Sequence, residues 1–407
     1  MATIKLKFRA STVAQAEGTL YYQVIHKRKV KWISTGYHVF RDEWDEKAAM
    51  VVVPHDGERT RKLQLLRSIV AWEIRQRKEL LWRMTNADKG YSVDELCEAF
   101  NHLPPCKTVF TFLQEQVDRQ LSMERHGTAK TYTSAYRRFR EFRDGSDLIF
   151  DDLSPDMIEE YEAWLLKRNL KQNTIRFYLR TLNTLLYKAA DNGLIADDRK
   201  LFSRVRLSYV TTIKRAIPEA DIRAIQRMQL TSGSIMAFAR DIFMFSFYMR
   251  GMPFVDIAFL RKSNLKGRTL TYCRKKTNHQ LTVEWEDEQR EIVERYAHLA
   301  KDTPYMLPII RRTDGTEYRQ YQRMQENINR ALKKIGSKIG LKMPLTSYTA
   351  RHSWASIARD MNIPIPVISE GMGHQSYKTT QVYLDSIDTS KINDANRIII
   401  HRISKEE

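Results

Sequence analysis

The stretch that decides the fold of this chain lies near its C-terminus and reads Leu345-Thr346-Ser347-Tyr348-Thr349-Ala350-Arg351-His352. It continues with Met372-Gly373-His374 and, nine residues after that histidine, with Tyr383. A tyrosine hydroxyl can act as a covalent nucleophile, and the planar fork of an arginine grips a phosphate through two parallel hydrogen bonds. An arginine, a histidine and a tyrosine gathered in one short segment of a basic chain therefore suit chemistry on a phosphodiester.

The chain as a whole is strongly basic. Its 407 residues, enough for two or three domains, carry 68 Lys and Arg against 49 Asp and Glu, a formal net charge of +19. Such an excess favours a polyanionic partner, most simply nucleic acid, and generic basicity is the alternative. Because the basic residues are spread along the chain and not gathered in a tail, they favour a long groove around a duplex.

The same composition argues against several other classes of protein. The three cysteines, Cys97, Cys106 and Cys273, form no C-x-x-C pair, which favours a reducing compartment without disulfides or a zinc site. No phosphate-binding loop or metal-ligand spacing occurs, so we expect no cofactor. No apolar run approaches the roughly 20 residues of a membrane helix, and the N-terminus lacks a signal-peptide core. We expect no membrane partner and a cytoplasmic location, at the nucleoid of a bacterial host when the protein is active.

Residues 1–90 are predicted to form a small β-rich domain followed by a basic linking helix. Apolar and basic residues alternate from Ile4 to Arg9, and similar runs follow at 19–25 and 30–36, as is typical of antiparallel strands with one wet face. A basic ribbon can read DNA in the major groove, and a solvated sheet face is the alternative. The candidate DNA contacts are Lys5, Lys7, Arg9, Lys27, Arg28, Lys29 and Lys31.

The rest of the chain has mainly helical patterns. Residues 105–205 follow Pro104-Pro105 and place apolar residues at helical spacing, which predicts a bundle with its aromatic residues in the core. Ser154-Pro155-Asp156 has the cap, proline and acid of a helix start. Residues 214–407 predict a mixed α/β domain with a β-hairpin insertion at 265–285. The expected fold class is therefore multidomain and mainly α.

The C-terminal motifs resemble the active-site boxes of the tyrosine recombinase (phage integrase) family, whose pattern is approximately L-T-x-H-x-x-R-H, then L-G-H, then a tyrosine nine residues on. The resemblance implies an arm-type DNA-binding domain at 1–90, a SAM-like core-binding bundle at 105–205 and a catalytic domain at 214–407. It also implies a homo-tetramer on double-stranded DNA with core-type and arm-type sites, and an accessory DNA-bending protein. Such a protein integrates, excises or inverts DNA through a 3′-phosphotyrosyl intermediate, without a metal or cofactor.

The family pattern also implies roles for single residues of the C-terminal boxes. Tyr383 matches the nucleophile, whereas Tyr377 has the wrong spacing from His374. Arg351 matches the second catalytic arginine of the family. His374 matches a histidine that hydrogen-bonds the scissile phosphate.

The basic run inside the β-hairpin supplies the remaining candidates. Lys276 stands as Lys-Thr before the second strand and matches the family's general acid, which protonates the leaving 5′-oxygen. Its neighbours Arg274 and Lys275 are candidate DNA contacts, and a solvated turn is the alternative for the whole run.

Two positions depart from the family pattern. Tyr348 stands in place of a histidine, and a tyrosine is neutral near pH 7, so it supplies no positive charge. The family's G-L-R-x-x-E-L-x-x-L aligns onto residues 251–260, where Pro253 replaces the first catalytic arginine. We expect Arg250 to substitute for it, although a helix-end charge is the alternative. Integrases of conjugative transposons and DNA-inversion recombinases that lack this arginine are the subgroup that the chain resembles.

Two rival functions share most of these features. A type IB topoisomerase uses the same nucleophile but acts on one duplex. An architectural DNA-binding protein derived from a recombinase would have lost its chemistry at Pro253 and Tyr348. The apolar stripe of Ile392, Ala395, Ile399 and Ile400 after Tyr383 is a surface for a neighbouring protomer or packs on its own domain.

Overall fold

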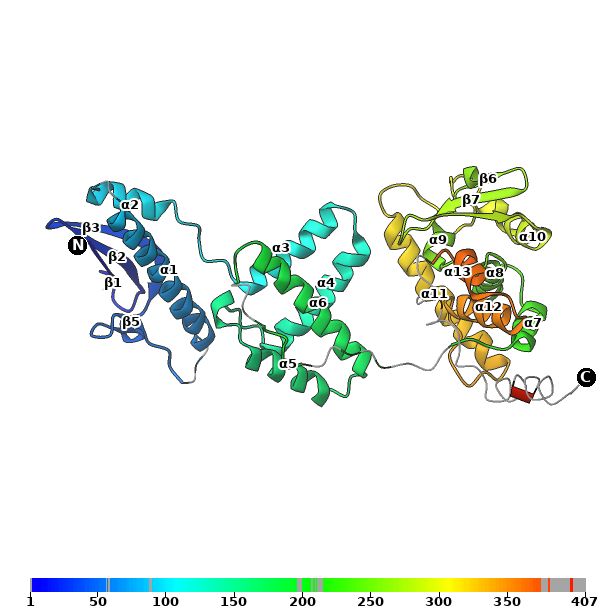
Figure 1. The fold of residues 1–407 in the computed structure, drawn as a ribbon, viewed down its shortest axis with the longest axis horizontal. Coiled ribbons are helices and arrows are strands. Elements are labelled where there is room, and N and C mark those ends of the chain that lie inside the picture. Colours follow the sequence, from blue (N-terminus) through cyan, green and yellow to red (C-terminus); the bar gives the residue numbers. More distant parts are fainter. Residues whose placement is uncertain are drawn as a thin grey trace, which may run out of the picture. The chain divides into compact units, whose positions relative to one another are not determined.

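The structure is a computed structural model that describes residues 2–55, 57, 59–87, 90–195, 200–205, 208, 210, 215–374, 380 and 396–397. The chain divides into two compact units, Met1–Thr211 and Thr212–Glu407 (Figure 1). Tyr383, Tyr377 and the predicted stripe from Ile392 to Ile400 lie outside the described residues. No helix in the described part of the chain is both long and apolar enough to cross a membrane.

Unit 1 begins with a three-stranded antiparallel sheet, as the alternating sequence predicts. Its strands β1 (Thr3–Arg9), β2 (Gly18–His26) and β3 (Lys29–Val39) lie in sequence order. The helices α1 (Thr60–Asn86) and α2 (Val93–Asn101) pack against this sheet, and the short strands β4 (Trp44–Asp45) and β5 (Met50–Val51) pair beside it (Figure 1). The buried side chains of the sheet are mainly apolar and include Ile4, Leu6, Leu20, Tyr22 and Val24.

A buried carboxylate of α1 joins the helix to the sheet. Glu73 accepts hydrogen bonds from the hydroxyls of Tyr22 at 2.6 Å and Tyr37 at 2.9 Å. Arg77, one turn later, donates to the same carboxylate at 3.3 Å. Buried charge is tolerated where it is paired and hydrogen-bonded, so this cluster fixes how α1 lies on the sheet.

Unit 1 continues as a helical bundle. Its helices are α3 (Val109–Ser122), α4 (His126–Phe142), α5 (Pro155–Lys167) and α6 (Gln172–Asp191). Ser154 caps α5 as its sequence predicts, because its Oγ accepts from the Met157 amide at 3.2 Å and Pro155 occupies the first turn. Phe139 and Tyr161 are fully buried, so the aromatic residues here do form the core.

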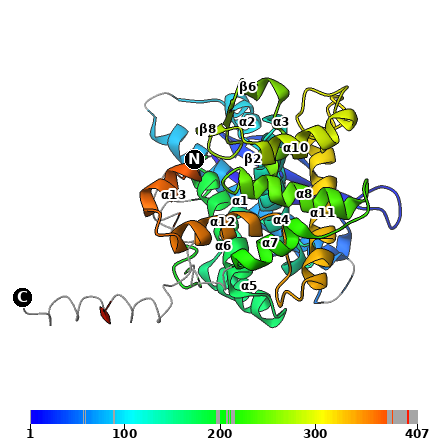
Figure 2. The ribbon, with the colours of Figure 1, turned by 90° about the vertical axis from the view of Figure 1, so that its right-hand side faces the viewer.

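Unit 2 is built around α8 (Ile235–Tyr248), which packs against several other helices (Figures 1 and 2). These are α7 (Glu219–Arg227), α10 (Asp287–Tyr296), α11 (Glu317–Lys338) and α12 (Thr349–Asp360). Two short helices, α9 (Phe254–Ala258) and α13 (Ile365–Gly371), also belong to this unit. Short 3-10 helices lie at Arg41–Glu43, Phe150–Asp152, Lys262–Asn264 and Ala297–Leu299.

The predicted hairpin is a three-stranded antiparallel sheet. Strands β7 (Thr269–Cys273) and β8 (Gln280–Glu284) pair in register from Thr269–Glu284 to Cys273–Gln280. A short strand, β6 (Leu265–Lys266), adds to the free edge of β7. The fold class predicted from the sequence, a mainly helical chain with a β-rich N-terminus and a β insertion near the C-terminus, is confirmed.

Gly251 is the backbone position on which the site of unit 2 depends. Its φ is +71°, a region that favours glycine, and an added Cβ would lie 2.7 Å from the Cα of Arg351. Gly267 is a useful comparison because its φ is +60° but nothing lies within 4 Å of an added Cβ.

We expect Gly251→Ala to destabilise unit 2 more than Gly267→Ala. The control carries only the backbone strain of a positive φ, about 1–2 kcal/mol, whereas overpacking adds about 1–3 kcal/mol at Gly251. Differential scanning calorimetry of the full chain measures both shifts in Tm. Equal shifts for the two variants would contradict the close approach of Gly251 and Arg351.

Candidate active site

Arg351 is the centre of the site. It lies in the first turn of α12 and is only 2% exposed. Its Nη1 donates to the carbonyl oxygen of Gly251 at 2.8 Å, and its Nη2 donates to the carbonyl oxygen of Met372 at 2.7 Å. The same Nη2 lies 2.7 Å from His374 Nε2. One buried guanidinium therefore joins three segments that are far apart in the sequence.

His374 is held as a neutral imidazole of defined polarity. A guanidinium only donates hydrogen bonds, so Nε2 must accept from Arg351, and the ring proton is on Nδ1. That Nδ1–H donates to Thr380 Oγ1 at 2.9 Å. Burial, together with the positive charges of Arg351, Arg274 and Lys276, lowers the pKa of His374 to about 3.

Arg274 lies inside the site, which the sequence reading missed. We predicted a DNA contact at this position, and the structure places the side chain in a buried environment, where Nη1 donates to the carbonyl oxygen of Gly373 at 2.9 Å. A longer contact of 3.4 Å reaches the carbonyl oxygen of Met372. The strand pattern contained the signal, because Leu270 and Tyr272 point inward and Arg274 continues that alternation.

Asp256 of α9 anchors the turn between β7 and β8. This residue occupies the glutamate position of the family's first box and is almost fully buried. Its Oδ1 accepts from the Lys275 amide at 2.8 Å, and its Oδ2 lies 3.7 Å from Arg274 Nε. Burial raises the pKa of Asp256, although the Lys275 amide and the nearby cations oppose that rise. The carboxylate thus fixes both the turn and the buried arginine.

The two lysines of the turn lie on its exposed side. Lys276 follows β7 in the turn, close enough to His374 to contribute to the lowered pKa of that histidine. Lys275 places its ammonium 4.5 Å from the ring centroid of Phe259, a cation–π contact that holds it against α9.

Gly373 lets the chain pass close to the sheet before His374. Its φ is +65°, and an added Cβ would lie 2.7 Å from Leu281 Cδ1 and 3.1 Å from Arg274 Cδ. A side chain here would displace the carbonyl that Arg274 holds. The Gly-His pair in the sequence is therefore a geometric requirement of this site.

The backbone around Pro253 accommodates a proline at the position of the family's first catalytic arginine. Pro253 is the N-cap of α9, where its carbonyl accepts from the Asp256 amide at 2.9 Å and no N–H is required of it. Arg250 has a φ of +56°, its Nη1 donates to the Thr282 carbonyl at 3.4 Å, and its Cδ would lie 3.7 Å from a Cβ on Gly371. It therefore borders the site from the outer side of β8.

Tyr348 lies at the entrance to α12. It is the N-cap residue of the helix and is 42% exposed. Its ring meets the ring of His352 edge-on, with centroids 5.2 Å apart. The two aromatic side chains lie one turn apart on the more exposed side of the start of α12, whereas Arg351 lies on its buried side.

The basic residues predicted to contact DNA in the N-terminal sheet divide between its two faces. The strand register aligns Lys5 with Trp32 through Gln23, and Lys7 and Arg9 share this open face. Lys29 and Lys31 point to the helix side, since they pair with the buried His26 and Val24, and Lys31 forms an ion pair with Asp94 of α2. Lys27 and Arg28 form the tight turn, with φ of 48° and 66°.

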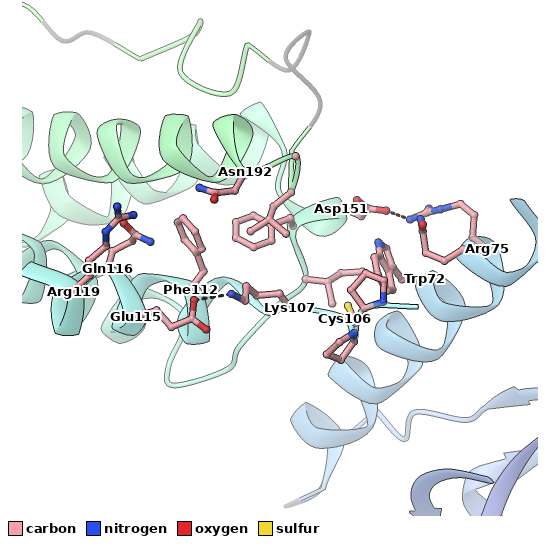
Figure 3. Close-up of a pocket in the computed structure, with 17 residues that line it drawn as sticks. Trp72, Arg75, Cys106, Lys107, Phe112, Glu115, Gln116, Arg119, Asp151 and Asn192 are labelled. Atoms are coloured by element: carbon pink, nitrogen blue, oxygen red, sulfur yellow. Dashed lines mark hydrogen bonds and ion pairs between the residues drawn. The ribbon is translucent and has the colours of Figure 1, made fainter. Parts of the chain in front are cut away.

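A separate cavity of about 960 Å³ lies in unit 1 between α1 and the bundle (Figure 3). Its charged groups largely neutralise one another, because Arg75 pairs with Asp151 and Lys107 with Glu115. Burial raises the pKa of Cys106 to about 12, which keeps its thiol protonated and unreactive. Within the described ranges, no three His, Cys, Asp or Glu side chains gather as a metal site.

Comparisons with known proteins identify the family to which the chain belongs. The model of the phage integrase SAM-like domain matches residues 108–204, and that of the phage integrase family matches 221–389. The tyrosine recombinase XerC of Rickettsia canadensis (strain McKiel) is 23% identical over 270 residues, 63% of this chain and 86% of that protein. XerD of Pseudomonas aeruginosa is 22% identical over 266 residues, 63% of this chain and 85% of that protein.

Solved structures show the same fold at low sequence identity. The integrase of transposon Tn1549, in complex with transposon right end DNA, has a TM-score of 0.52 and 13% identity, covering 74% of this chain and 100% of that chain. A lambda integrase tetramer bound to a Holliday junction has a TM-score of 0.50 and 14% identity, covering 91% and 95%. The two family models cover successive parts of the sequence that together make up well over half of it, and the chain belongs to the tyrosine recombinase (phage integrase) family.

Proposed function

We propose that this protein is a site-specific recombinase that cuts and rejoins DNA strands through Tyr383. The observation that carries the proposal is the buried cluster of Arg351, His374 and Arg274, with Lys276 on the adjoining turn. Positive groups held in place before the substrate arrives are what a phosphoryl transfer needs when no metal balances the charge.

The reaction exchanges one phosphate ester for another and therefore needs no external energy. The Tyr383 hydroxyl attacks the phosphorus, the bond from phosphorus to the 5′-oxygen breaks, and a 3′-phosphotyrosyl bond forms. Lys276 donates a proton to the leaving 5′-oxygen, a role typically worth about 10²–10⁴ in rate. The 5′-hydroxyl of a partner strand then attacks the phosphotyrosyl bond and releases Tyr383.

The phosphate is gripped by arginines, with His374 as a neutral partner. In the described state, His374 donates its one N–H to Thr380, so it would have to move that proton to Nε2 before donating to a phosphate. Its role here is to orient the Arg351 guanidinium. Tyr348, at the rim of α12, is placed to add a neutral hydrogen bond to the DNA.

We assign the missing cationic role to Arg274 ahead of Arg250. Arg274 is buried against the backbone of Gly373, directly before His374, and its charge acts on that imidazole. Arg250 bonds to the outer strand and is the second candidate. With Arg274 in this role, the phosphate meets as many cations as in a family member that has an arginine at the position of Pro253.

The wider assembly follows from the same family. Residues 1–90 would bind arm-type sites, 105–205 core-type sites, and 214–407 would carry out the chemistry in the cytoplasm. Four protomers on two duplexes, assisted by a DNA-bending protein, would exchange strands, and the C-terminal tail would contact a neighbouring protomer. Lys5 and Arg9, together with the turn residues Lys27 and Arg28, are arm-domain groups with open access to a duplex, whereas Lys7 is ion-paired with Glu46.

The first prediction concerns the nucleophile. Incubation with a nicked cognate duplex, from which the short strand is lost after cleavage, should give a covalent protein–DNA adduct on a denaturing gel. Tyr383→Phe should abolish the adduct, because the nucleophilic oxygen is gone, and Tyr377→Phe should retain it. If the wild type binds specifically without forming an adduct, the architectural DNA-binding protein is favoured. If adducts form but two labelled duplexes give no joint products, a topoisomerase is favoured.

The second prediction concerns the two arginines. Arg274→Ala should slow adduct formation by about 10²–10³, the usual loss for one preorganised donor, and Arg274→Lys should recover only part of it. Arg250→Ala should have a smaller effect. DNA affinity and Tm serve as controls, since Arg274 also holds two backbone carbonyls. A larger defect in Arg250→Ala than in Arg274→Ala would reverse the assignment.

The third prediction concerns pH. The pKa of His374 is about 3 in the folded protein and about 6.5 in an unfolded chain. Below pH 6.5 the unfolded chain takes up a proton that the folded site excludes, so stability is lost as the pH falls from about 6.5 towards 3. The difference in Tm between wild type and His374→Gln should therefore shift in favour of the variant between pH 7.5 and 5.5. A constant difference would mean that the imidazole is not held neutral.

A further inference from the structure

Thr380 has no part in the mechanism above, yet it is bound to the core of the site. Among the described residues it is fully buried, and its Oγ1 is the acceptor for His374 Nδ1 at 2.9 Å. A buried hydroxyl that accepts a hydrogen bond from a catalytic imidazole is placed to control more than packing.

The hydrogen bonds form a directed chain from the phosphate site to Thr380. Arg351 donates through Nη1 to Gly251 and through Nη2 to Met372 and His374. His374 then donates from its other nitrogen to Thr380. Because an arginine cannot accept, the direction of every step is set, and the ring cannot turn over without breaking both bonds.

The sequence places the nucleophile a short distance further along. Tyr383 follows Thr380 by three residues, so its Cα lies at most about 11 Å from that of Thr380 even for a fully extended chain. Fixing Thr380 to His374 therefore limits how far the Tyr383 segment can lie from the His374 imidazole. Small displacements of a reacting group are costly, since a misplacement of about 1 Å can cost about 10²-fold in rate.

We propose that Thr380 is a positioning residue that ties the Tyr383 segment to the phosphate-gripping Arg351 through the His374 imidazole. This inference rests on the proposed function of Tyr383 as the nucleophile. Thr380 touches neither the phosphate nor the leaving group, and it acts through the placement of the attacking oxygen.

The test compares variants that differ in the hydroxyl alone. Thr380→Val keeps the shape and removes the oxygen, and Thr380→Ser keeps the oxygen. Thr303→Val is the matched control, because Thr303 is a buried threonine of the same unit whose hydroxyl lies within hydrogen-bond distance of the backbone carbonyls of Ala300 and Tyr305. Thr380→Ala takes the place of the valine variant if the latter folds poorly. The full chain is used throughout, with DNA affinity and Tm measured for each variant.

Thr380→Val should slow adduct formation on the nicked duplex by about 10-fold or more, within the range of a small misplacement, with unchanged DNA affinity. Thr380→Ser and Thr303→Val should both form the adduct at a rate within a few-fold of wild type. On a substrate whose 5′-bridging oxygen is replaced by sulfur, the thiolate leaves without an acid. The defect of Thr380→Val should persist on this substrate, because Thr380 acts on the placement of the attacking oxygen. The same substrate should rescue Lys276→Ala.

Three results would overturn the inference: a valine variant as fast as wild type, a serine variant as slow as valine, or rescue of the valine variant by the sulfur substrate. The last would place Thr380 on the leaving-group side. Failure of the wild type itself to form an adduct would instead remove the proposed function. The two failures are thereby distinguished in one set of reactions.

Discussion

The site depends on one constraint: the buried guanidinium of Arg351 must find acceptors inside the protein. An unpaired buried charge is strongly unfavourable, and Arg351 meets its need with two backbone carbonyls and an imidazole nitrogen. Those acceptors come from Gly251, Met372 and His374, so α8, α12 and α13 can pack in only a narrow range of arrangements. The glycines at 251 and 373 follow from this, since a side chain at either position would overlap the groups that make these contacts.

A second consequence is electrostatic. Arg351, Arg274 and Lys276 gather around His374, and the carboxylate of Asp256 lies beside Arg274. Burial and the surrounding positive charges together keep the imidazole neutral, and the excess of those charges leaves the site best matched to an anion. A DNA phosphate entering it would gain from charges that are already fixed in place, which is how a metal-free site stabilises a phosphoryl transition state.

The sequence predicted the elements well and their side-chain partners poorly. Helical spacing identified the bundle and its aromatic core, and the Ser154-Pro155 start of α5 was read directly from local chemistry. Arg274 was predicted as a DNA contact from a run of three basic residues, and its burial could be expected only from its position in the strand alternation. Thr380 and Asp256 could not be assigned from local pattern at all. Their partners lie in other segments, and only the tertiary fold brings them together.

The most direct measurement is a structure of the full chain covalently trapped on a nicked cognate duplex. The account predicts a phosphorus bonded to the Tyr383 oxygen, with nitrogens of both Arg351 and Arg274 within hydrogen-bond distance of the same phosphate. A phosphate held by Arg351 and Arg250, with Arg274 still bonded only to the backbone at 372–373, would contradict the central claim about how this site completes its charge. So would a linkage through any other tyrosine.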